Sequence, residues 1–100
     1  MNKRFIDYQE KLLNDLQDPE EATAYLNAAL MDDDPRVFLV ALKNVVAAQG
    51  KISSVAKKTK LNRENLYRML SEKGNPKLTS IIPILKVLGF NLSVNRYKNK

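Results

Sequence analysis

Residues 53–70 read SSVAKKTKLNRENLYRML, and this stretch decides the fold. It predicts two short helices, over 53–59 and 62–70, joined by a tight turn. The apolar side chains spaced to pack the two helices at a steep angle are Val55, Ala56, Leu61, Leu66 and Met69. We interpret the pair as a helix-turn-helix. In that arrangement the N-terminal residues of the second helix can enter the major groove of DNA.

The second helix presents a polar face opposite Leu66. At about 100° per residue, the residues that point outward are Glu64, Asn65, Tyr67 and Arg68, with Arg63 at the flank of the first turn. Arginine can bind guanine, asparagine can bind adenine, and glutamate can accept from cytosine. Asn62 caps this helix and, with its N-terminus, can hold a phosphate.

Short donors and cations surround this helix. Ser53 and Ser54 suit contacts to the DNA backbone, and the lysines that would add salt-sensitive affinity are Lys51, Lys57, Lys58, Lys60, Lys73 and Lys77. Each residue also has a structural interpretation: Glu64 and Arg68 can form an ordinary surface pair, Asn62 can be only a cap, and Tyr67 can be half-buried. The combination of spacing, polar face and charge favours sequence-specific DNA binding.

Helix signals continue on both sides of this stretch. Asp18-Pro19 and Asp34-Pro35 predict helix starts, Ser53 is the expected cap of the first short helix, and Gly50 predicts a left-handed helix end. We therefore predict one all-α domain over 1–100, a repressor-like helix-turn-helix bundle of about five helices. Its predicted parts are an amphipathic arm or helix over 1–17, a DNA-binding core over 18–89, a strand over 90–95 and a tail over 96–100.

Charge is distributed unevenly along the chain. The 17 basic and 11 acidic residues give +6 overall, but residues 1–34 sum to −6 and residues 35–100 to +12. A basic half of this kind indicates nucleic acid or another anionic partner. The acidic half indicates a second, different partner.

Several functional classes are excluded by composition. The chain has no Cys and no His, so thiolate zinc sites, Ser-His triads and disulfides cannot form, and we expect no metal and no cofactor. No apolar run approaches the roughly 20 residues of a membrane span, and the N-terminus lacks the apolar core of a signal peptide. We expect a cytoplasmic protein that is not an enzyme. The enzymatic alternative, a small basic ribonuclease, would have only Glu64 and Glu72 as acids in its basic part.

Several motifs together resemble a known family. They are Asp18-Pro-Glu-Glu-Ala22, Ala24-Tyr-Leu-Asn-Ala-Ala-Leu30, Leu61-Asn-Arg-Glu-Asn-Leu-Tyr67, and the stretch from Gly74-Asn-Pro76 to Leu88-Gly-Phe-Asn-Leu-Ser-Val94. The chain resembles, over residues 7–95, the addiction-module antidote proteins, which are antitoxins with a Cro/repressor-type (XRE-like) helix-turn-helix.

The resemblance implies an all-α DNA-binding fold, repression of the chain's own operon and a small basic RelE/ParE-like toxin, usually encoded next door. It places base readout on Asn62, Arg63, Glu64, Asn65 and Arg68. Two positions depart from the pattern. Lys60 stands where the turn usually has glycine, which costs about 1 kcal/mol if the residue is left-handed. Pro83 interrupts the last helix, so we expect that helix to begin at Thr79 or Ser80.

Two further surfaces are predicted with open alternatives. Phe90, Leu92 and Val94 alternate as a strand that can pair with its copy in a homodimer or dock on its own subunit. Such a dimer would place two recognition helices about 34 Å apart on a palindromic operator. In the arm we predict four apolar toxin anchors, which are Tyr8, Leu12, Leu13 and Leu16. The alternative is that this helix packs on the chain's own core. A stand-alone prophage-type repressor without a toxin is the alternative function.

Overall fold

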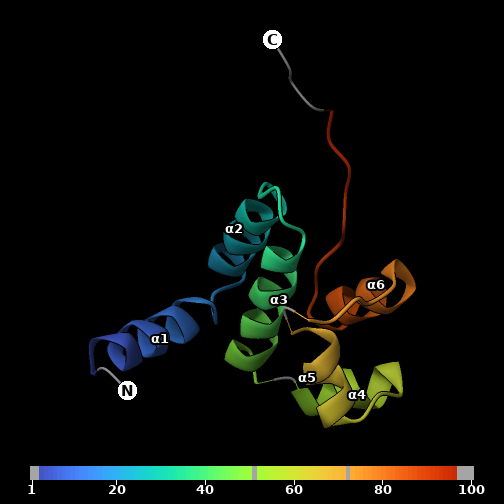
Figure 1. Cartoon of the computed structure of the whole chain (residues 1–100), viewed down its shortest axis with the longest axis horizontal. Helices are drawn as coiled ribbons and strands as arrows, with labels where there is room; N and C mark the ends of the chain where they lie inside the picture. Colours follow the sequence, from blue (N-terminus) through green and yellow to red (C-terminus); the bar gives the residue numbers. More distant parts are fainter. Residues whose placement is uncertain (1–2, 51, 72, 97–100) are drawn as a thin grey trace.

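The computed structural model describes residues 3–50, 52–71 and 73–96, and every regular element in them is a helix. The elements are α1 (Lys3–Asp15), α2 (Pro19–Leu30), α3 (Arg36–Ala48), α4 (Ile52–Thr59), α5 (Arg63–Met69) and α6 (Leu78–Val87) (Figure 1). The predicted all-α fold is therefore confirmed. The described residues form six helices, counting the N-terminal one.

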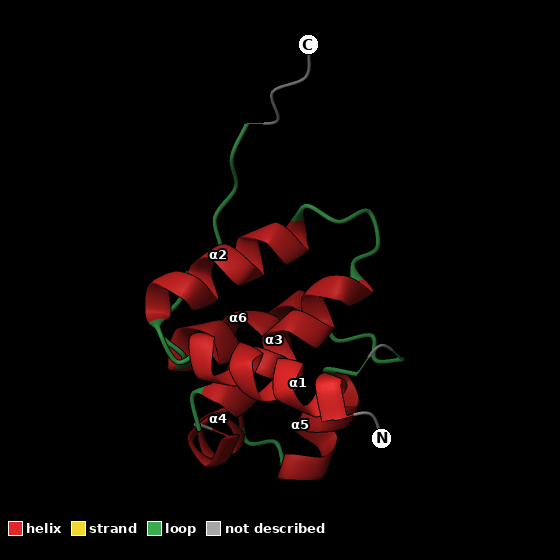
Figure 2. Ribbon diagram, turned by 90° about the vertical axis from the view of Figure 1, so that its left-hand side faces the viewer, coloured by secondary structure: helices red, strands yellow, loops and turns green. Residues whose placement is uncertain are grey.

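Helix α3 is the common packing partner of α1 and α2, and its buried residues belong to the same core as those of α4, α5 and α6. Helices α1 and α2 both pack on α3, while α4 packs on α6 and on α5 (Figures 1 and 2). The largest fully buried side chains come from both halves, and they are Leu16, Leu42, Val45, Val46, Val55, Leu66, Leu70 and Ile84. One apolar core therefore supports both the acidic N-terminal helices and the basic C-terminal ones.

The helix ends follow the local sequence signals. Asp18 caps α2 by accepting a hydrogen bond of 3.0 Å from the Glu20 N–H, and Pro19 occupies the first helical position. Gly50 and Gly89 both have positive φ angles, of 62° and 91°. After Gly89 the Phe90 N–H donates to the Leu85 carbonyl at 2.8 Å, which closes the end of α6 as a Schellman motif.

Two side-chain hydrogen bonds connect the N-terminal helices to α3. The Asn44 amide on α3 donates to the Tyr25 hydroxyl on α2 at 2.9 Å. The Gln49 amide at the end of α3 donates to the backbone carbonyl of Leu16 at 3.2 Å. The second bond holds the end of α1 against α3, where Leu16 enters the core.

The predicted C-terminal strand is absent from the described residues. Residues 90–96 form no ladder. Beyond Phe90 they run past α2 and the start of α3, where Leu92 lines the same hollows as Leu30 and Phe38 (Figure 1). The alternation of Phe90, Leu92 and Val94 does not suffice for a strand, because a strand needs a neighbouring strand to supply its backbone hydrogen bonds and none of the described residues provides one.

Two helix starts also differ from the predictions. Helix α4 begins at Ile52, so Ser53 lies within its first turn and is not its cap. Helix α6 begins at Leu78, which puts Pro83 inside the helix as its sixth residue. Because Pro83 and Thr79 are exposed, water can satisfy the Thr79 carbonyl that a proline cannot bond.

Some predicted features lie outside the described residues: the first two residues of the arm, Lys51, Glu72 and residues 97–100 of the tail. Within the described ranges, no helix is both long enough and apolar enough to span a bilayer.

Candidate nucleic-acid interface

The second short helix, α5, starts at a side-chain cap. Asn62 is extended, with φ −81° and ψ 167°, and its side-chain oxygen accepts a hydrogen bond of 2.7 Å from the Asn65 N–H. This satisfies one of the backbone donors that a helix leaves unpaired at its start. The helix has only seven residues, so a single cap is a large share of its local stabilisation.

The turn before α5 contains a strained residue. Lys60 has a φ angle of 61°, the left-handed conformation that a side chain disfavours. It reverses the chain so that the Leu61 N–H can donate to the Ala56 carbonyl at 3.1 Å, the bond that closes a Schellman motif. Leu61 then packs against the core. The turn therefore has the left-handed geometry that glycine usually provides.

Helix α5 has one buried and one exposed face. Leu66 is fully buried, as is Leu70 just after the helix. The predicted readout residues are exposed, and these are Asn62, Arg63, Glu64, Asn65 and Arg68. Tyr67 is half-buried and packs against the core. The outward face predicted from the helical spacing is thus found, with Tyr67 at its edge.

The polar groups on this face have few partners within the chain. Glu64 and Arg68 are four residues apart, yet they form no ion pair among the described residues. Their charged ends are therefore available to an outside ligand.

The end of α5 is in close contact with the following loop. The Ser71 hydroxyl donates to the Arg68 carbonyl at 2.8 Å, and the Gly74 N–H donates to the Ser71 carbonyl at 2.9 Å. A Cβ atom at Gly74 would lie 2.1 Å from the Met69 carbonyl oxygen. Only glycine lets the loop approach the helix this closely.

This close approach forms a hollow beside α5. Its volume is about 540 Å³, and its wall combines Asn65, Arg68 and Lys73 with the loop residues Asn75 and Pro76. Three predicted DNA contacts are thereby brought together from two elements. Asn75 also lines the hollow, although it was not among the predicted site residues, because its position beside α5 depends on the close approach of the loop. Among the described residues, no cluster of three acidic side chains could hold a metal ion.

The remaining predicted contacts lie on neighbouring elements. Ser53, Ser54, Lys57 and Lys58 are exposed on α4, and Lys77 is exposed at the cap of α6. Helix α4 packs on both α5 and α6, and Lys73 lines the hollow beside α5. The arrangement can present base-edge donors and acceptors at its centre and phosphate-binding cations around them.

Comparison with known proteins identifies the family. Residues 7–96 match the family described as "Probable addiction module antidote protein". The chain belongs to this family. The chain is also 32% identical, over 81 residues, to a Haemophilus influenzae (strain Rd) protein named "Uncharacterized protein", a match that covers 81% of this chain and 82% of that protein. No solved structure matches.

Membership of an antidote family supports an antitoxin role, and it suggests a regulatory protein and not an enzyme. An antidote of this family implies a cognate toxin. The four toxin anchors predicted in α1 and just after it are placed unequally in this antidote. Tyr8 is 65% exposed, Leu12 and Leu13 are partly buried against the core, and Leu16 is fully buried in it.

The predicted dimer residues of the antidote are also placed unequally. Phe90 packs partly against the core, whereas Leu92 is 38% and Val94 is 96% exposed. Only the last two are therefore open to a second copy.

Proposed function

We propose that this chain is a sequence-specific DNA-binding antitoxin that represses its own operon and neutralises a small basic RelE/ParE-like toxin. The observation that carries the DNA-binding part is the exposed polar face of α5. Asn65 and Arg68 face outward, and Arg68 is not paired with Glu64, while Leu66 fixes the opposite face in the core.

In the proposed complex, α4 and α5 form an XRE-like helix-turn-helix. The exposed face of α5 enters the major groove, where Asn65 in the first turn reads adenine and Arg68 in the last turn reads guanine. Lys57, Lys58, Lys73 and Lys77 neutralise phosphates on either side and supply affinity that does not depend on sequence. The charge of +12 over residues 35–100 supports this division of roles.

The antitoxin part of the proposal is supported by the family and by charge. A net charge of −6 over residues 1–34 attracts a basic protein, and this half of the chain lies on α1, α2 and the following loop. A stand-alone repressor would have the same DNA face, and the antidote family favours the version with a toxin.

We further propose that the antitoxin binds a palindromic operator as a homodimer, with two α5 helices about 34 Å apart. Leu92 and Val94 are the exposed apolar residues available for self-association at the C-terminal end. Sedimentation of a monomer alone at micromolar concentration, with and without operator, would contradict the dimer.

Fluorescence anisotropy on the chain's own upstream DNA, measured across salt concentrations, tests the proposed DNA binding. Arg68→Ala should lose about 1–3 kcal/mol of preference for the operator over random duplex. Lys58→Ala is the matched control, because it should weaken both duplexes equally and reduce the salt slope by about one. Equal affinity of the wild-type protein for operator and random duplex would refute specific readout.

A further inference from the structure

A second groove borders the hollow beside α5 through residues 74–76, and it lies where the loop between α2 and α3 faces the start of α6. It has a volume of about 470 Å³. Its walls come from the end of α2, the α2–α3 loop, the start of α3, residues 74–76, the first part of α6 and Leu92 of the C-terminal segment. Segments far apart in the sequence therefore build one concave surface.

The groove offers apolar side chains to an outside group. Leu30 is 47% exposed and Leu78 is 60% exposed, and both line the groove together with Leu92. Phe38, Leu39 and Ile81 form its buried floor. An apolar side chain inserted here would remove these surfaces from water, which is the usual energetic basis of an anchor residue.

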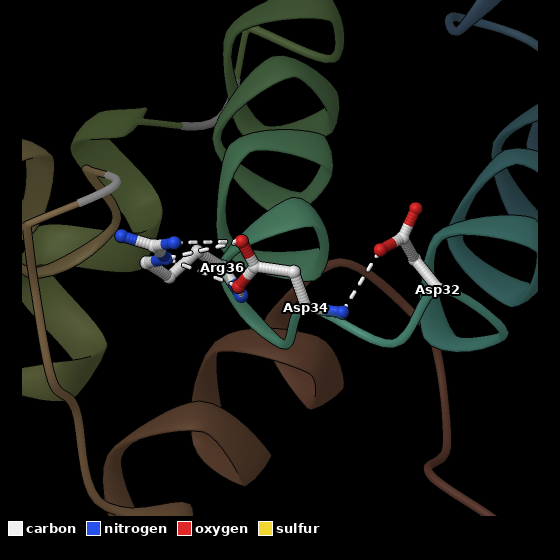
Figure 3. A network of polar contacts seen from close by, with 3 residues as sticks. All are labelled: Asp32, Asp34 and Arg36. Carbon is white, nitrogen blue, oxygen red and sulfur yellow. Dashed lines mark hydrogen bonds and ion pairs between the residues drawn. The ribbon is translucent and has the colours of Figure 1, made fainter.

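The rim of the groove is acidic. Arg36 lines the groove and is neutralised by Asp34, which lies outside the lining, with Arg36 Nη2 2.8 Å from Asp34 Oδ2 (Figure 3). The other charged residues that line the groove are Asp32 and Asp33, both exposed on the loop. The α2–α3 loop therefore gives the groove a negative edge beside an apolar floor.

Helix α1 has fewer apolar residues to offer a partner. Leu16 is part of the core, and Leu12 and Leu13 pack against it, which leaves Tyr8 and Ile6 as its exposed large apolar side chains among those described. Compared with α1, the groove therefore offers more exposed apolar surface to an anchor residue, and it places that surface beside the carboxylates of Asp32 and Asp33.

We infer that this groove is the docking surface for a basic protein segment that inserts an apolar side chain between Leu30 and Leu78 and sets its cations against Asp32 and Asp33. The inference rests on the proposed function, since the toxin is the basic partner. Charge complementarity selects this occupant, because the rim is acidic and the segment that fits it must be basic.

The test measures the affinity of the full chain for the purified small basic protein encoded beside its gene. Asp33→Lys and Leu78→Ser each alter one half of the groove, and each should raise Kd at least about tenfold. Glu10→Lys and Tyr8→Ser make the same charge change and a comparable loss of exposed apolar surface on α1, the competing surface that the sequence predicts. If the groove is the docking surface, each α1 variant should raise Kd less than about threefold at physiological salt. Circular dichroism spectra and melting temperatures check that all four variants fold.

Each other outcome overturns the inference. Weakening by the α1 variants alone would move the contact to α1, and unchanged affinity in all four variants would exclude both surfaces. Dissociation of a homodimer of the chain itself by Asp33→Lys or Leu78→Ser would assign the groove to a second copy. If the wild-type chain binds the basic protein and both groove variants bind it with the same Kd, the groove is rejected but the proposed function stands. No complex with the wild-type chain rejects the proposed toxin partner as well.

Discussion

The side-chain oxygen of Asn62 accepts a hydrogen bond of 2.7 Å from the backbone N–H of Asn65, so two neighbouring asparagines have separate tasks at the start of α5. Asn62 uses its side chain to cap the helix. Asn65 uses only its backbone, and its own side chain is free to face an outside ligand.

This division predicts different effects for two alanine variants. Asn62→Ala should lower the free energy of unfolding by about 1 kcal/mol, because the cap is lost. Asn65→Ala keeps the backbone donor, so it should change stability by less than about 0.5 kcal/mol while reducing preference for the operator. Urea unfolding and operator anisotropy of both variants check this. Equal loss of stability in the two would contradict the separation.

Replacing Lys60 by glycine should stabilise the chain. The left-handed conformation at φ 61° costs a residue with a side chain about 1–2 kcal/mol. Glycine removes that strain but loses about 0.5–1 kcal/mol through its freer unfolded state. Lys60→Gly should therefore raise the free energy of unfolding by up to about 1.5 kcal/mol. Lys60→Ala controls for the lost charge, since it keeps the Cβ atom and should show no gain in urea unfolding.

Gly74→Ala should be among the more damaging small substitutions in the loop regions. Its Cβ would meet the Met69 carbonyl oxygen at 2.1 Å and the Arg68 carbonyl oxygen at 2.9 Å, both of them backbone atoms. Relief requires the end of α5 or the loop to move, so we expect a loss of about 1–3 kcal/mol and weaker operator binding.

Gly50→Ala is the matched control for this variant. Its Cβ would meet nothing within 4 Å, and only the left-handed φ of 62° is strained. It should cost about 1 kcal/mol and leave operator binding unchanged. A Gly74→Ala protein as stable as wild type in thermal unfolding would show that the loop is not held against α5.

Acid should remove the contribution of the Asp34–Arg36 pair. The hydrogen bonds that Asp34 accepts from the Arg36 side chain and backbone lower its pKa from the ordinary value of 3.8. A carboxylate with a lowered folded pKa stabilises the fold above its unfolded pKa, and that contribution is lost as pH falls from 3.8 through the folded pKa. The stability difference between wild type and Asp34→Asn should therefore shrink below pH 3.8.

Urea unfolding at a series of pH values measures this difference. Arg36→Met is the complementary variant, because it removes the hydrogen bonds that lower the Asp34 pKa. A difference between wild type and Asp34→Asn that stays constant from neutral pH to well below 3.8 would contradict the assignment.

The features that could be predicted from the sequence are the ones that neighbouring residues determine. Asp18, Asn62 and Gly50 each act within a few positions of the chain, and their roles as caps and as a left-handed stop are confirmed. The buried and exposed faces of α5 were predictable for the same reason, since a helix repeats every 3.6 residues.

The features that escaped prediction depend on distant parts of the chain. Residues 90–94 have a strand pattern but no partner strand in the described chain, and Pro83 is tolerated within α6 because its helix face is exposed. The approach of Gly74 to Met69 requires the fold to set a loop against a helix end. The two grooves were beyond sequence reasoning because each combines residues from several elements.

The loop of residues 74–76 has ligand-accessible space on both of its sides. It lines the hollow beside Arg68 and also the groove beside Asp33. Such a shared wall is a route for thermodynamic linkage: a ligand that shifts the loop from one side changes affinity on the other, by the same factor in both directions. A titration of one ligand in the presence of the other would therefore measure the coupling free energy that residues 74–76 transmit between the two sites.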